Sequence, residues 1–200
     1  MSAPSRSKSV GRRSAGQILR SRGRGALIGT LIGVGWMAYG LLWFPNVVRI
    51  LLALLGATIV VPLLLRSKGL VEASRKMPAP DAEQLAANRR IWTLFWLNFA
   101  LEIVLLNIAI NLLQAPALRM YWIPAISFVV GLHFLPMAQF FRVPSYWICG
   151  AAMMAVAIVA TITIRWGIFL PPAVAAAEAL INALILWLTV AKGIRSMAAA

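Results

Sequence analysis

The chain has 200 residues, of which 62% are hydrophobic and only 12% are charged, whereas soluble domains carry about a quarter of charged residues. Its 19 Lys and Arg residues outnumber its 5 Asp and Glu residues, and the formal net charge is +14. The charges gather in a few segments between apolar runs of about twenty residues, which excludes a soluble enzyme domain and indicates an integral membrane protein.

Residues 1–25 form a basic segment that is rich in Ser, Arg and Gly and contains no acidic residue. Such a composition cannot bury enough apolar surface to fold alone, so the sequence predicts a disordered tail. The tail could serve only to fix topology, bind anionic lipid headgroups, act as a transit peptide or bind nucleic acid. Nucleic acid is disfavoured, because no aromatic residue lies among the arginines to stack on bases.

Six apolar runs follow, each long enough to cross a hydrocarbon core of roughly 30 Å as a helix. Their apolar residues do not alternate with polar ones, which favours helices over barrel strands. The predicted fold class is therefore all-α, a polytopic bundle of six transmembrane helices over residues 26–191. The predicted spans are 26–44, 47–65, 91–113, 122–141, 146–164 and 171–191, with a loop at 66–90 and a tail at 192–200.

The distribution of Lys and Arg predicts how these spans are oriented. Cationic residues that flank spans in short loops are retained in the cytoplasm. With six spans, all of the 19 Lys and Arg residues except Arg49, Arg119 and Arg165 lie on one side. We therefore expect both termini and the 66–90 loop to be cytoplasmic.

Two features along the first half of the chain predict local structure. Gly25, Gly29 and Gly33 recur every four residues in the first span and give it a smooth face. That face suits close packing against another helix of the same chain, and the alternative is a homo-oligomer formed through the first span. Asp81, with Gln84 three residues later, is typical of a capped helix start, so the third helix should begin before its span.

Polar side chains inside the spans are expensive in lipid and are therefore candidates for function. Glu102 and His133 each lie about eleven residues, or about 16 Å, into their spans from opposite sides, which places both near the midplane. Asn182 reaches the same depth in the last span, and Glu178 lies one turn away from it. Interaction of these groups with the lipid bilayer itself is unfavourable, so they should face protein or a cavity.

Helical spacing assigns faces to these residues. Asn98 and Glu102 are four residues apart and share one face of the third span, whereas Asn107 and Asn111 point almost the opposite way. A helix that is polar on two sides should be surrounded by protein, so we expect the third span at the centre of the bundle.

The last span carries a single polar stripe that should face inward. Its members are Ala175, Glu178, Asn182 and Thr189. The candidate midplane site then comprises Glu102, His133, Asn98, Glu178 and Asn182.

The fourth span contains the string Gly-Leu-His-Phe-Leu-Pro at residues 131–136. Pro136 cannot donate to the carbonyl of Leu132, so a kink should leave a bare acceptor beside His133. Such a place suits a proton, a cation or a polar ligand. The alternative is that His133 packs as a neutral side chain and hydrogen-bonds another helix.

The same string, followed by Arg142-Val143-Pro144, resembles one found in small bacterial multi-spanning membrane proteins. The resemblance covers about one span and the turn after it. It implies an integral protein of the bacterial cytoplasmic (inner) membrane and carries no activity over.

Motifs for known chemistry are missing from the sequence: there is no Walker loop, no His-Glu-x-x-His pair, no nucleophile elbow and no dinucleotide fingerprint. Cys149 is the single cysteine, which excludes an internal disulfide and a Cys-based zinc site. The sequence predicts no cofactor and no metal, and an enzyme is disfavoured.

Three functions remain open. The first is a small transporter or permease-like protein with a midplane polar site. The second is a structural or partner-binding membrane protein whose polar residues only pack helices. The third is a lipid-acting enzyme that uses His133 and Glu102 as an acid–base pair, although these residues lie deep for a headgroup substrate.

Overall fold

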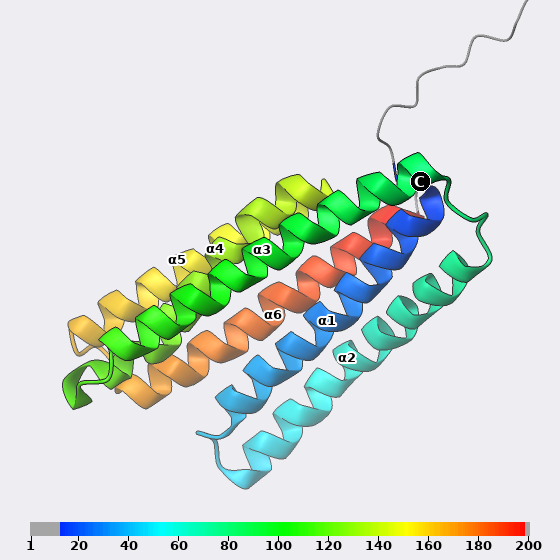
Figure 1. Cartoon of the computed structure of the whole chain (residues 1–200). Coiled ribbons are helices and arrows are strands. Elements are labelled where there is room, and N and C mark those ends of the chain that lie inside the picture. Colours follow the sequence, from blue (N-terminus) through cyan, green and yellow to red (C-terminus); the bar gives the residue numbers. More distant parts are fainter. Residues whose placement is uncertain (1–12, 199–200) are drawn as a thin grey trace, which may run out of the picture.

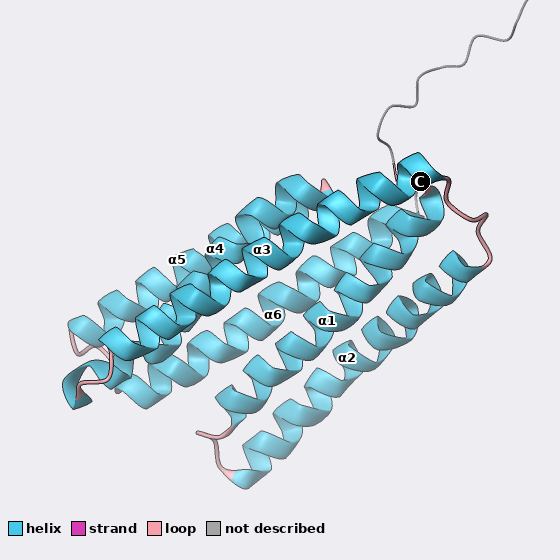
Figure 2. Cartoon of the chain, in the orientation of Figure 1, coloured by secondary structure: helices cyan, strands magenta, loops and turns pink. Residues whose placement is uncertain are grey.

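The computed structural model describes residues 13–198, without the side chains of the last two of these. This part of the chain consists of six α-helices and a short 3-10 helix, with no strand, which confirms the all-α prediction (Figure 2). The elements are α1 (Ala15–Leu41), α2 (Asn46–Arg75), α3 (Ala82–Leu112), η1 (Pro116–Tyr121), α4 (Trp122–Phe141), α5 (Ser145–Arg165) and α6 (Pro171–Ala198).

The predicted disordered tail is too long, because α1 begins at Ala15 rather than after residue 25. Ser14 and Gln17 form a capping box: the Ser14 hydroxyl accepts from the Gln17 backbone N–H, and the Gln17 side chain accepts from the Ser14 backbone N–H. This cap, and packing against the end of α2, stabilise a basic segment that would not fold alone. Residues 1–12 lie outside the described part of the chain.

The predicted loop at 66–90 is mostly helical. α2 continues to Arg75 and α3 begins at Ala82, so the connection shortens to residues 76–81. The helix start predicted at Asp81 is confirmed, since the Asp81 carboxylate accepts from the Gln84 backbone N–H at 2.8 Å. At 1.5 Å per residue the 30-residue α2 is about 45 Å long, so it extends well beyond a hydrocarbon core.

Five helical segments in the described residues are long and apolar enough to cross a membrane, which indicates a multi-pass membrane protein. They are α2, α3, α4 together with η1, α5 and α6. The predicted first span is not among them, because the arginines and glycines of α1 lower its hydropathy. α1 nevertheless lies side by side with α2 and α6 in the bundle (Figure 1).

The bundle is built around α6, which packs against α1 and α5 along its length and also contacts α2 and α4. The inward-facing stripe predicted for this helix is confirmed for Ala175, Glu178 and Asn182, which are all buried. In contrast, α3 packs mainly along α4, and none of its residues, all of which are described, is buried. The central position predicted for the third span is therefore wrong.

The error arose from Asn107 and Asn111, which face outward on α3. Each amide donates to the backbone carbonyl four residues earlier in the same helix, Asn107 to Ile103 and Asn111 to Asn107, both at 2.8 Å. Local bonds of this kind satisfy the amide N–H groups without a neighbouring helix.

The glycine face of α1 is used within the chain. A Cβ on Gly29 would lie 3.0 Å from Val190, and Gly33 faces the Trp187 ring, both residues belonging to α6. Trp187 Nε1 also donates to the backbone oxygen of Thr30 at 3.2 Å. A large indole thus fits against α1 because the opposing residue has no side chain.

The Lys and Arg residues are concentrated at the helix ends on one side of the bundle. The start of α1, the connection between α2 and α3 and the C-terminal end of α6 lie together at one end of the bundle (Figure 1). We call this the basic end, since most of the Lys and Arg residues flank these segments.

Candidate functional site

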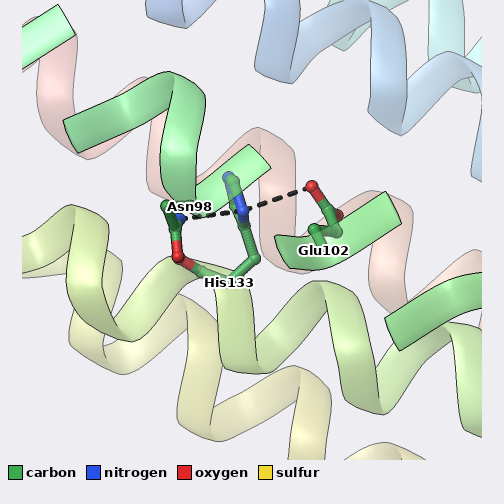
Figure 3. A network of polar contacts seen from close by, with 3 residues as sticks. All are labelled: Asn98, Glu102 and His133. Atoms are coloured by element: carbon green, nitrogen blue, oxygen red, sulfur yellow. Dashed lines mark hydrogen bonds and ion pairs between the residues drawn. The ribbon is translucent and has the colours of Figure 1, made fainter. Parts of the chain in front are cut away.

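Three polar side chains join α3 to α4 and form what we call the polar triad: Asn98, Glu102 and His133 (Figure 3). The Asn98 amide nitrogen lies 2.9 Å from His133 Nδ1 and donates to the His133 backbone oxygen at 3.1 Å. A carboxylate oxygen of Glu102 lies 3.2 Å from the same Nδ1 atom. The triad thus connects two helices through both the ring and the backbone of one histidine.

Local sequence explains how the triad is positioned. Asn98 and Glu102 are one helical turn apart, so both reach His133 from the same face of α3. Phe95 and Phe134 meet the imidazole edge-on, with ring centroids 6.4 Å and 6.0 Å away. The side chains of His133 and Glu102 are only 9% and 12% exposed, so their contact lies in a largely apolar environment.

The hydrogen-bond roles within the triad depend on a proton. His133 Nδ1 has one position for hydrogen bonding in the ring plane, and it either carries a hydrogen or accepts one. If Nδ1–H donates to the Glu102 carboxylate, Asn98 keeps its bond to the His133 backbone oxygen. If Nδ1 is bare, it accepts from Asn98 or from a protonated Glu102. The geometry therefore holds a proton that either Glu102 or His133 can carry.

Two members of the triad, Glu102 and His133, border a partly open cavity of about 180 Å³ between α1, α3, α4 and α6, and Tyr146 of α5 also lines it. Glu102 and His133 line it together with apolar side chains of all four helices. These include Ile28, Ile32, Phe95, Phe99, Phe134 and Leu186. Apolar cavities of about 150 Å³ bind small hydrocarbons, so this space is large enough for an apolar group of a ligand.

At the basic end the same cavity is lined by Arg13 and Arg22. Arg13 Nη1 donates to the Ser21 hydroxyl at 3.2 Å, and its guanidinium lies 5.7 Å from the centre of the Phe141 ring. Burial, followed by repulsion from Arg22 and Arg142, lowers the pKa of Arg13 below its usual value. Both arginines are half-buried, and we call this positively charged end of the cavity its mouth.

The other two predicted site residues belong to a separate group, the core cluster of Ser127, Glu178 and Asn182. Asn182 Nδ2 donates to the Ser127 hydroxyl at 2.7 Å, and that hydroxyl donates to the Met153 backbone oxygen at 3.4 Å. Glu178 is 2% exposed and Asn182 is 0% exposed, and neither lines the cavity. Both carboxylate oxygens of Glu178 lack a hydrogen-bond partner within the described residues.

The five-residue candidate site therefore divides in two. Glu102 and His133 meet at the cavity with Asn98 bonded to His133 beside it, whereas Glu178 and Asn182 lie in the protein core between α4, α5 and α6. Pro136 lies within a continuous α4, one turn after the triad histidine. The acceptor near it that binds Asn98 is the backbone oxygen of His133 itself.

The sequence prediction missed Arg13 and Arg22, because it assigned them to a disordered tail. A signal was present: Arg22, Gly25 and Gly29 are three and seven residues apart and so share one helical face. All three line the cavity.

Comparisons with protein-family models, with curated proteins and with solved structures found no match to this chain. The described residues also hold no group of three or more His, Cys, Asp or Glu side chains placed to bind a metal ion.

Proposed function

We propose that the protein is a small transporter whose substrate site is the cavity between α1, α3, α4 and α6. The observation that carries the proposal is the contact of Glu102 with His133, held by Asn98, on the wall of a partly open cavity inside apolar helices. Polar side chains that only pack helices together would need no cavity beside them. A cavity with few polar contacts among apolar side chains is typical of a ligand site.

The Glu102–His133 pair supplies the proton chemistry of the proposed transporter. Carboxylate and imidazole groups in membrane helices often form proton relays. When His133 Nδ1–H donates to the Glu102 carboxylate, the pair holds one shared proton. Uptake of a second proton by the pair changes the attraction between α3 and α4. Because α3 packs mainly along α4, the protonation state of the pair can alter how firmly α3 is held against the cavity.

We further propose that the basic end faces the cytoplasm of a bacterial cell, with α1 as a sixth span and both termini on that side. The support is the gathering of Lys and Arg at one end of the bundle, as the positive-inside rule requires. In this orientation the charged mouth of the cavity lies at the cytoplasmic leaflet.

The test is proton movement into liposomes of phosphatidylcholine and phosphatidylglycerol that enclose a pH-sensitive dye. With an inward proton gradient, the wild-type protein should acidify the interior faster than protein-free vesicles do, and Glu102→Gln should lose most of this flux. Glu72→Gln is the matched control, because Glu72 makes an exposed i,i+4 pair with Lys68 at 3.9 Å, away from the cavity. Size-exclusion chromatography establishes that both variants are folded.

Wild-type vesicles that acidify no faster than empty ones would contradict the transporter proposal. Equal flux in wild-type and Glu102→Gln vesicles would contradict the role of the triad. The competing function, a structural or partner-binding membrane protein, is favoured by the core cluster, where Asn182 and Ser127 bridge two helices without bordering the cavity.

A further inference from the structure

The mouth of the cavity carries positive charge that no acidic side chain of residues 13–198 neutralises. Arg13 and Arg22 line it, and the exposed Arg142 follows Phe141, whose ring centre lies 5.7 Å from the Arg13 guanidinium. Within residues 13–198 none of these three arginines forms an ion pair with an acidic side chain. Guanidinium groups gathered in this way, two of them partly buried, favour an anion whose oxygens can accept bidentate hydrogen bonds, such as a phosphate.

Beyond the arginines the cavity continues as an apolar space. On α1 its lining runs from Arg22 to Ile32, a distance of about 15 Å along the helix axis. On the opposite side it is lined by the aromatic residues Trp92, Phe95 and Phe99 of α3. Charge at one end and mostly apolar side chains along the rest, which Glu102 and His133 interrupt, match the two parts of an amphiphile.

The arrangement of α3 leaves a route from the side. α3 packs mainly along α4, and α1 packs along α2 and α6, so the two helices that face each other across the cavity are not closely packed together. An acyl chain can therefore enter between α1 and α3 while the rest of a lipid stays in the bilayer.

We propose that the cavity binds an anionic phospholipid, with its phosphate at Arg13, Arg22 and Arg142 and one acyl chain between α1 and α3 that reaches toward the polar triad. This names the substrate class of the transporter proposed above and rests on that function. A phospholipid fits better than a free fatty acid, because the charged mouth lies at the end of the bundle where phosphate headgroups lie.

The test is native mass spectrometry of the full chain in detergent, titrated with phosphatidylglycerol, phosphatidylcholine of the same acyl chains, or oleate. The proposal expects one phosphatidylglycerol to bind at least about tenfold more tightly than either competitor, because each basic residue near the surface adds about fivefold to anionic lipid binding. This comparison uses the wild-type protein, so it holds whether or not any variant folds.

Two variants locate the bound lipid. Replacement of Arg13, Arg22 and Arg142 together by Gln should weaken phosphatidylglycerol binding at least about tenfold. The control replaces Arg66, Lys76 and Arg89 by Gln, which removes the same charge from exposed positions outside the cavity, and should change binding less than about threefold.

The second variant, Ile32→Trp, fills the apolar end of the cavity without changing charge. It should also weaken phosphatidylglycerol binding, whereas Ile50→Trp, at an exposed site on α2, should not. A lipid held at the surface by charge alone would be insensitive to Ile32→Trp, and that result would overturn the cavity assignment.

Other outcomes also overturn the proposal. Oleate binding as tight as phosphatidylglycerol, with the same dependence on the arginines, would make a free fatty acid the ligand. Equal affinities in the wild type and the triple-Arg variant would remove the arginines from the site. Lipid binding without proton flux would retain the lipid site and reject the transporter, whereas flux without preferential lipid binding would do the reverse.

Discussion

The polar triad and the core cluster each place one glutamate inside the membrane-crossing helices, yet their surroundings differ. Glu102 lies 3.2 Å from His133 on the wall of a cavity, held on a peripheral helix. Glu178 is buried on the central helix with no hydrogen-bond partner for its carboxylate among the described residues. Side chains of the same type, at similar depth, therefore have different chemical roles open to them.

The difference shows that depth in a span is a poor guide to function. Both glutamates satisfy the rule that an ionisable residue in a membrane helix is a functional candidate. The two glutamates differ in whether a cavity adjoins the carboxyl group, since a ligand or a proton must reach it. The following predictions test that separation.

The largest expected difference between the two regions is in the rate at which a thiol reagent modifies them. Cys149, the single cysteine of the chain, is 0% exposed and should be inert to N-ethylmaleimide in the folded protein. A cysteine at position 102 should react at least about tenfold faster than one at position 178, because only the first borders the cavity. Mass spectrometry of timed samples measures both rates, and equal rates would mean that the two regions are equally sealed.

The core cluster should depend on the close crossing of α4 and α5. A Cβ on Gly131 would lie 2.8 Å from the backbone oxygen of Gly150, an atom that cannot move without shifting its helix. Gly131→Ala should therefore lower the free energy of unfolding by about 1 to 3 kcal/mol in an SDS titration. Gly35→Ala is the control, since nothing lies within 4 Å of the added carbon. A neutral Gly131→Ala would show that the crossing can loosen.

Replacement of the buried glutamate should stabilise the protein. Glu178→Met removes a buried carboxyl group whose oxygens have no hydrogen-bond partner among the described residues, so the free energy of unfolding should rise by about 1 to 2 kcal/mol in the same titration. Glu72→Met, at the exposed pair with Lys68, should change it by less than about 0.5 kcal/mol. A destabilised Glu178→Met would indicate that the carboxyl group binds something inside the core.

The smallest effect concerns the triad amide. Asn98→Ala removes the contacts to His133 Nδ1 and to its backbone oxygen, and should cost about 0.6 kcal/mol, the average for hydrogen bonds between membrane helices. Asn107→Ala should cost less, because that exposed amide bonds only within its own helix. The two variants are compared by SDS unfolding, and a larger loss for Asn107→Ala would contradict the assignment of Asn98 as the link between α3 and α4.

Some of the candidate site could be predicted from spacing. Asn98 and Glu102 share a face because residues four apart lie one above the other, and their partner His133 stood out as the single histidine. The inward stripe of α6 was predictable for the same reason. The meeting of Glu102 with His133, and the separation of both from Glu178, depended on which helices are neighbours, and a helical period carries no such information.

The position of α3 could not be predicted from the spacing of its polar residues. Polar residues on two faces predicted a central helix, but Asn107 and Asn111 satisfy their amide N–H groups locally and leave α3 at the edge. The length of α1 was underpredicted. Composition predicted that its basic segment is disordered, but the segment is helical from Ala15, because a capping box begins it and α2 packs beside it.

The sequence by itself determined that the chain is helical and multi-pass, since long apolar runs must satisfy their backbone hydrogen bonds internally. It also determined where most turns lie and which residues of each helix share a face. The tertiary structure alone decided which faces meet: α6 at the centre, α3 at the edge, and a cavity between them that joins Arg22 to Glu102 and His133. The physical reason is that helix packing depends on the shapes of two surfaces at once, such as Trp187 against Gly33, and these are far apart along the chain.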